Sequence, residues 1–141
     1  MNNIYAQFFR VINSAMSALI DLYEVNFLQL GNIYTKCGPK ICAFSKIKRF
    51  IDHFGFHPRV CGAVWELLQK DSRLRNGCKM KHLLMVFYYI KNNNTESQAR
   101  SRFDIDEDTY RSWKEYLLRF MSDLKVVSHA SQNQHNTLIV L

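Results

Sequence analysis

The stretch TESQARSRFDIDEDTYRSW, residues 95–113, decides the fold of this chain. Thr95 is a good N-cap for a short helix over residues 96–103, because its hydroxyl can accept a hydrogen bond from a free backbone N–H of the first turn. Asp106 can cap a second helix in the same way, since it follows a tight turn at residues 104–106. The spacing therefore predicts two helices joined by a short turn.

Apolar side chains at helical spacing show how these two helices would pack. Ala99 and Phe103 lie four residues apart and share one face of the first helix. The second helix has an inner face of three apolar residues: Tyr110, Trp113 and Leu117. Because Ala99 is small, the two helices can cross closely, with Ile105 filling the angle between them. This arrangement predicts a helix-turn-helix over residues 95–124.

The outward face of the second helix carries the candidate contacts to DNA. In a helix-turn-helix protein, the N-terminal residues of this helix meet base edges in the major groove. Arg111 can pair with guanine through two hydrogen bonds, and Ser112 or Asp108 can read a neighbouring base. Thr109 and Lys114 are better suited to phosphate groups. The acidic start of the helix is also ordinary in helical proteins, because it complements the helix dipole, and it would repel phosphate.

Positive charge is concentrated in the middle of the chain. The formal net charge is +7, and residues 41–92 hold most of the excess of Lys and Arg over Asp and Glu. Seven of these side chains are candidates to bind phosphate: Lys46, Lys48, Arg49, Arg73, Arg75, Lys79 and Lys81. If DNA binds, these residues must flank the second helix of residues 95–124 on one surface.

The rest of the chain predicts an all-α protein, a small domain of about five or six helices. The apolar pattern of residues 4–30 indicates one helix or a broken pair, ended by Gly31 and Asn32. Further helices are expected over residues 41–54, 58–70 and 80–91, the last of which is so apolar that a buried strand is the alternative.

These elements suggest a division of the chain into three parts. Residues 1–40 form an N-terminal helical extension, residues 41–128 a DNA-binding domain, and residues 129–141 a flexible polar tail. The chain has no apolar run long enough to cross a membrane and no secretory leader. We therefore expect an intracellular protein with reduced cysteines.

Catalytic and metal sites have weak support in the sequence. His53, His57 and Cys61 have a spacing of four, but Gly55 and Pro58 break the helix that such a metal site would need. There is no phosphate loop and no nucleophile elbow. We expect no catalytic residue, no metal and no cofactor. The alternative to DNA binding is a helical domain that binds other proteins.

Several segments, taken in order, resemble a known family. They are the run FIDHFGFHPRVC at residues 50–61, Trp65, KHLL at 81–84, NTE at 94–96 and DEDTYRSW at 106–113. Over residues 50–125 the chain resembles the N-terminal DNA-binding region of eukaryotic DDE transposases of the PIF/Harbinger and insertion-sequence groups.

The resemblance implies a nuclear protein that binds duplex DNA, which in the family is the transposon end. In the family a separate ribonuclease-H-like domain carries an acidic triad that holds two magnesium ions. The residues after Leu124 cannot build that domain, so we expect a truncated or derived form without catalysis. Its further partners would be a full-length transposase or a second copy of itself.

Overall fold

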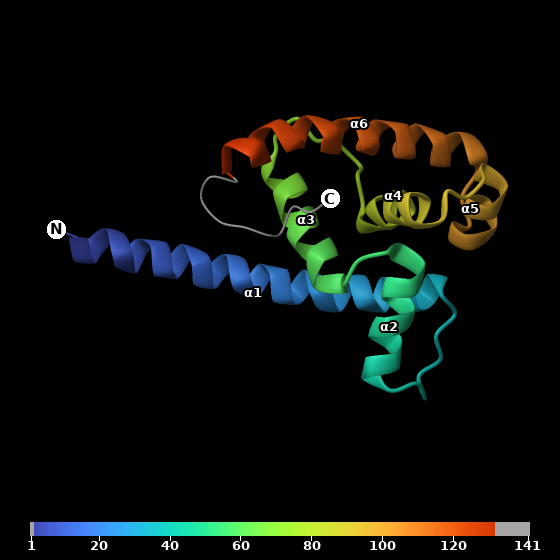
Figure 1. Cartoon of the computed structure of the whole chain (residues 1–141), viewed down its shortest axis with the longest axis horizontal. Coiled ribbons are helices and arrows are strands. Elements are labelled where there is room, and N and C mark those ends of the chain that lie inside the picture. Colours follow the sequence, from blue (N-terminus) through green and yellow to red (C-terminus); the bar gives the residue numbers. More distant parts are fainter. Residues whose placement is uncertain (1, 132–141) are drawn as a thin grey trace.

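The computed structural model describes residues 2–131, and every regular element in that range is a helix (Figure 1). The six helices are α1 (Asn2–Tyr34), α2 (Ala43–Phe54), α3 (Pro58–Lys70), α4 (Met80–Asn92), α5 (Glu96–Phe103) and α6 (Glu107–Ser131). The predicted all-α class and the C-terminal pair of helices are confirmed. Residues 80–91 are helical, so the strand alternative is wrong.

Helix α4 lies between α6 on one side and α2 on the other (Figure 1). Its residues from Leu83 to Phe87 are all fully buried. The core around them is built from large side chains of the other helices: Phe27, Phe50, Phe54, Leu68, Phe103, Tyr110 and Leu117. A nearly continuous apolar run therefore became a central helix, because its neighbours cover it on several sides.

The first helix is longer than the sequence suggests. It continues through Gly31 and Asn32 to Tyr34, so the predicted end at Gly31 is wrong. Gly31 serves packing instead, because a Cβ atom there would lie within van der Waals overlap of the Phe50 ring. The glycine thus allows α2 to approach α1. Phe27, in the same helix, is fully buried in the core, so part of residues 1–40 packs with the rest of the chain.

A second glycine sets the crossing of α3 over α1. A Cβ atom on Gly62 would lie 3.1 Å from Cβ of Tyr23 and 3.2 Å from the backbone nitrogen of Glu24. Beside this contact Arg59 makes ion pairs with Asp21 and, at 3.1 Å, with Glu24. Close backbone approach and this charge cluster together hold α3 against the second half of α1.

The predicted break between α2 and α3 is confirmed in detail. Gly55 ends α2 with φ 83°, a left-handed conformation that favours glycine. His57 precedes α3, and its Nδ1 accepts a hydrogen bond from the backbone N–H of Arg59 at 3.0 Å. Pro58 then occupies the first turn, where its missing N–H costs nothing.

The end of the chain is partly helical. Residues 129–131 of the predicted polar tail belong to α6, and the remaining residues of that tail lie outside the described range. All four cysteines are free. None of the helices within residues 2–131 combines the length and the apolar character needed to cross a membrane.

Candidate nucleic-acid interface

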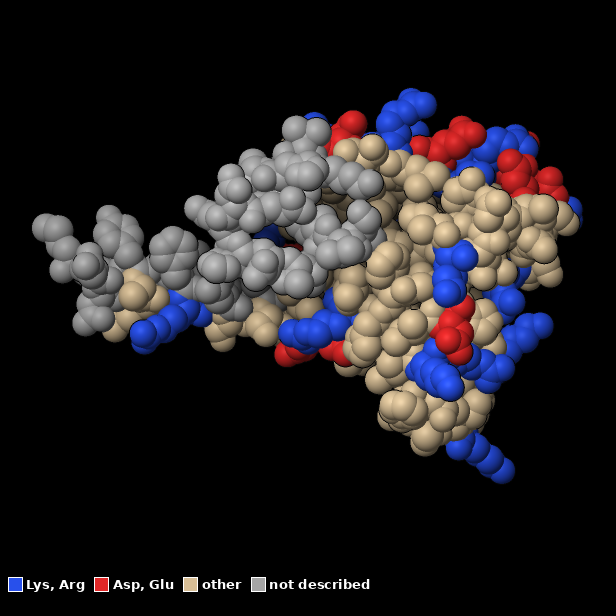
Figure 2. Space-filling view, viewed as in Figure 1, with Lys and Arg blue, Asp and Glu red and all other residues tan. Residues whose placement is uncertain are grey.

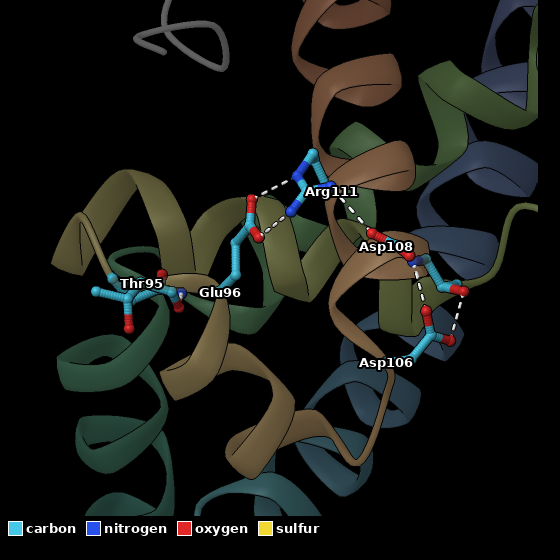
Figure 3. Close-up of polar contacts among 7 residues, drawn as sticks. Thr95, Glu96, Asp106, Asp108 and Arg111 are labelled. Carbon is cyan, nitrogen blue, oxygen red and sulfur yellow. Dashed lines mark hydrogen bonds and ion pairs between the residues drawn. The ribbon is translucent and has the colours of Figure 1, made fainter.

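Helices α5 and α6 form the predicted helix-turn-helix, and both predicted caps are present. The Thr95 hydroxyl accepts the backbone N–H of Gln98 at 3.2 Å, and the Gln98 side chain accepts the N–H of Thr95 at 2.9 Å. Asp104 closes α5 in a left-handed conformation, with φ 50°. Oδ1 of Asp106 then accepts the N–H of Thr109 at 2.8 Å at the start of α6 (Figure 3).

The inner faces of the two helices are packed, and the expected Ile105 and Trp113 are partly buried against the core. Ala99 and Phe103 of α5 are fully buried, and so are Tyr110 and Leu117 of α6. The buried Asn94 amide donates to the hydroxyl of Tyr110 at 3.1 Å and so ties the entry of α5 to α6. The two helices are therefore a rigid unit with a packed inner face.

Arg111 does not extend freely into solvent. Its Nε donates to the Glu96 carboxylate at 2.7 Å, with a second bond from a terminal nitrogen to the same group, and it also contacts Asp108 at 3.0 Å (Figure 3). These bonds raise the pKa of Arg111 and lower the pKa of Glu96. To bind guanine, Arg111 must exchange its two bonds with Glu96 for two bonds with the base.

Sequence reasoning missed Glu96. Glu96 and Arg111 lie 15 residues apart on different helices, so no i, i+4 spacing points to their contact. The only available signal was that Glu96 follows the cap of α5 and must lie near the turn. Asp108, in contrast, is almost fully exposed despite its contact with Arg111, and remains open to a ligand.

Two expected phosphate ligands have contacts within the fold. The Thr109 hydroxyl donates to Oδ2 of Asp106 at 2.6 Å, so it supports the cap of α6. Nζ of Lys114 lies 4.4 Å from the centre of the Tyr89 ring and 5.5 Å from that of Tyr110. These cation–π contacts join α6 to α4. Neither side chain is directed away from the protein as a simple phosphate ligand would be.

The loop between α3 and α4 brings Arg75 against the exposed face of α6. Its backbone N–H donates to the Tyr116 hydroxyl at 2.6 Å, and its guanidinium lies 4.2 Å from the centre of the Tyr116 ring. The same guanidinium is 5.2 Å from the Trp113 ring centre and 3.4 Å from the Ser112 hydroxyl. Arg75 and Ser112 thus share one exposed edge, as the DNA-binding hypothesis requires.

Arg73 and Lys79 belong to the same loop. Arg73 binds Asp71 through two nitrogens at 3.0 and 2.8 Å and lies over the Phe120 ring of α6 at 5.9 Å. The ion pair lowers the pKa of Asp71 to about 2. Lys79 is exposed at the start of α4. The loop therefore presents positive charge beside α6, with part of the Arg73 charge already neutralised.

His82 of α4 packs against Trp113, near the start of α6. Its ring stacks on Trp113 with centroids 4.1 Å apart and planes 10° apart. Its Nδ1 accepts the N–H of Lys79 at 2.9 Å. Burial, together with the charges of Lys81 and Lys79, lowers the pKa of His82 to about 4. The imidazole is therefore neutral at physiological pH, and Trp113 has a fixed position.

The remaining predicted basic residues are elsewhere. Lys46, Lys48 and Arg49 lie on α2, which α4 separates from α6 (Figure 1), and Lys81 is half-buried on α4. On the face drawn in Figure 2, basic and acidic side chains alternate along the edge where Figure 1 places α5 and α6. The seven basic candidates are therefore divided between two sides of the protein, because α2 folds back on α1 and α4 rather than toward α6.

An open hollow beside the start of α6 has the wrong charge for phosphate. It lies between α5 and the start of α6, and four carboxylates line it, at Asp104, Asp106, Glu107 and Asp108. Arg100 is the basic residue that accompanies them. These carboxylates would repel a phosphate group at the turn between the two helices.

His53 and His57 make contacts within the fold, and Cys61 is part of the core. Nδ1 of His53 lies 2.9 Å from the Arg49 carbonyl oxygen, and His57 caps α3. Cys61 is fully buried, which raises the pKa of its thiol. Across residues 2–131, no three His, Cys, Asp or Glu side chains gather in a way that would hold a metal ion.

Comparisons with protein-family models, with curated proteins and with solved structures gave no match.

Proposed function

We propose that the protein binds duplex DNA, with α6 in the major groove and the edge formed by Ser112 and Arg75 directed toward the duplex. The observation that carries this proposal is the placement of Arg75. A loop from the basic middle of the chain holds its guanidinium 3.4 Å from the Ser112 hydroxyl on the exposed face of α6. Base-reading and phosphate-binding groups then lie on one surface.

The aromatic support of Arg75 favours this role. Its guanidinium lies over the Tyr116 ring, so one planar face of the fork is covered while its edge keeps N–H donors. Less side-chain entropy is lost on binding when the fork is already oriented. Arg73 and Lys79 flank it in the same loop and would add contacts to the phosphate backbone.

Base recognition would come from the first turns of α6. Asp108 and Ser112 are exposed, and Arg111 can reach a base when the duplex displaces Glu96. The exchange gives selectivity, because only a site with guanine at the right place offers Arg111 an equivalent pair of acceptors. On this proposal the chain corresponds to the end-binding part of a DDE transposase and acts in the nucleus.

The test is the affinity for duplex DNA as a function of salt concentration, measured by fluorescence anisotropy. Phosphate binding predicts a linear loss of log affinity with log salt concentration. Arg75→Ala should reduce the slope by about one phosphate contact. Lys48→Ala removes the same charge on α2 and is the matched control. Equal effects of both substitutions, or an affinity that salt does not change, would contradict the proposal.

A second candidate function is binding to another protein. Several large apolar side chains are exposed, among them Leu22, Val25 and Phe44. Such side chains support an interaction surface where they are contiguous. The salt series above separates the two functions. A domain that binds only other proteins should not bind duplex DNA with an affinity that falls steeply as salt concentration rises.

A further inference from the structure

The loop before α2 and the first half of that helix carry positive charge without acidic neighbours in the sequence. No Asp or Glu occurs between Glu24 and Asp52, and this interval holds five basic residues: Lys36, Lys40, Lys46, Lys48 and Arg49. Lys46 is half-buried and the other four are exposed. We call residues 36–49 the α2 tip.

The charge of the α2 tip is not neutralised within the fold. None of its five basic side chains forms an ion pair with another residue of the described range. Cations on other elements are paired, as Arg59 is with two carboxylates of α1, and Arg73 with Asp71. The α2 tip therefore keeps its charge for an external anionic partner.

The apolar face of α2 continues past the part that the fold covers. Phe50 and Phe54 are buried in the core, with exposed fractions of 1% and 0%, whereas Phe44, near the start of the helix, is 77% exposed. Ile47, three residues after Phe44, is only half-buried. A basic helix with an uncovered aromatic side chain is typical of contacts with a membrane surface.

The α2 tip forms a corner of the molecule, on the side of α1 that faces away from α6 (Figure 1). In Figure 2 the same corner shows uncharged residues at its end, with Lys and Arg side chains around them. A convex corner of this kind fits a flat surface. Its apolar end can enter the boundary between lipid head groups and acyl chains, while the long basic side chains stay among the head groups.

We propose that the α2 tip binds the surface of a membrane that contains anionic lipids. Phe44 enters the lipid interface, and the five basic side chains lie close to the negative charges of the head groups. The contact is peripheral, because it uses one aromatic ring and no spanning segment. The edge of α6 formed by Ser112 and Arg75 lies on the other side of the protein and stays free.

The aromatic content of the α2 tip favours a membrane over a single-stranded nucleic acid. Proteins that bind single strands stack successive bases on several aromatic rings. Phe44 is the single aromatic residue of the α2 tip. Tyr34, the aromatic residue before it in the sequence, packs on Phe103 with ring centroids 4.9 Å apart, and Phe50, the next one after it, is buried. Aliphatic Ile47 can enter lipid but cannot stack on a base.

Sedimentation of the full chain with vesicles tests the charge requirement, without DNA. The protein should bind vesicles of phosphatidylcholine and phosphatidylserine but not vesicles of phosphatidylcholine alone, and salt should weaken the binding. Lys40→Gln combined with Lys48→Gln should lower the affinity about fivefold for each lysine removed. Lys79→Gln combined with Arg119→Gln removes the same charge from exposed positions outside the α2 tip and is the matched control. No binding to the anionic vesicles, equal binding to both vesicles, or equal losses from the two pairs would overturn the proposal.

The role of Phe44 can be tested separately, because its exposure allows substitution without loss of the core. Phe44→Ser should lower the affinity for anionic vesicles about tenfold or more, since the ring no longer leaves water. Leu67→Ser is the control, at an apolar residue of α3 that is 46% exposed. Added Trp emission should move to shorter wavelength with vesicles for Phe44→Trp and not for Leu67→Trp. A Phe44→Ser protein that binds vesicles as wild type does, or a loss seen only with a single-stranded oligonucleotide, would contradict the proposal.

Discussion

Glu96 of α5 binds Arg111 of α6 through two hydrogen bonds, with Nε 2.7 Å from the first carboxylate oxygen. The ion pair joins the two helices at the solvent-exposed edge of their contact, which buries Ala99 and Phe103. The ion pair therefore stabilises the crossing angle of the two helices. It also occupies the guanidinium of Arg111, the side chain best suited to bind guanine.

Glu96→Gln should lower Tm at neutral pH, because the charge-assisted bonds to Arg111 are lost. The pKa of Glu96 is lowered in the folded protein, so its stabilising effect is present above the usual glutamate pKa and is lost as pH falls through the lower folded value. The difference in Tm between wild type and variant should therefore shrink below about pH 4. Glu115→Gln, at an exposed position further along α6, is the control. A Tm difference that pH does not change would contradict this prediction.

The stability of the fold should depend on the protonation of His82. Its pKa is lowered to about 4 in the folded protein, whereas the unfolded chain binds the proton near pH 6.5. The free energy of unfolding should thus fall as pH decreases from about 6.5 to about 4, by up to about 3 kcal/mol. His82→Phe keeps a ring against Trp113 but cannot titrate, so its curve should lack this fall. Denaturant titrations at several pH values would show it, and parallel curves for both proteins would refute the prediction.

Gly62→Val should destabilise the contact between α1 and α3. Its side chain would push against the backbone of α1, since Cβ alone would lie 3.2 Å from the Glu24 nitrogen and 3.3 Å from the Ile20 oxygen. We expect a loss of about 1–3 kcal/mol in the free energy of unfolding, as for overpacked cores. Gly38→Ala is the control, because a Cβ atom there meets nothing within 4 Å. Chemical denaturation of both variants would decide, and a Gly62→Val protein as stable as wild type would show that α1 is not held there.

Arg111→Ala and Arg75→Ala should differ in their effect on DNA selectivity. Removing Arg111 should relax the preference for guanine at one position by about tenfold or more, because a bidentate base contact is lost. Removing Arg75 should weaken all duplexes alike if it binds phosphate. A selected library of duplexes, bound by each variant and sequenced, measures both effects. If both substitutions changed the base preference equally, the assignment of base recognition to Arg111 and of phosphate binding to Arg75 would be wrong.

Local sequence patterns predicted most of the fold. The caps at Thr95 and Asp106, the helix break at Gly55 and the central position of residues 80–91 follow from short-range preferences, and each is present. The predicted end of the first helix is wrong, because α1 continues through Gly31 to Tyr34. The actual role of Gly31 is to allow a close contact with Phe50, a residue of another helix. Spacing along the sequence does not indicate such contacts between helices.

The candidate site was less predictable, for the same reason. The sequence pointed to the residues of α6 that face outward, but not to the contacts that several of them make within the fold. Glu96 on Arg111, Tyr89 under Lys114 and Tyr116 under Arg75 are all contacts between distant segments. The separation of α2 from α6 is likewise a property of tertiary packing. The distribution of charge along the sequence pointed to a basic middle segment, but not to the division of its side chains between two sides of the protein.

The most direct test of DNA binding through α6 is a two-dimensional NMR titration of the isotope-labelled protein with a duplex. The account predicts that backbone amide signals change most at Ser112 and its neighbours in α6 and at Arg75 in the adjoining loop, while those of Lys46 and Lys48 on α2 stay in place. Changes centred on α2, or no changes at low salt with excess duplex, would contradict it.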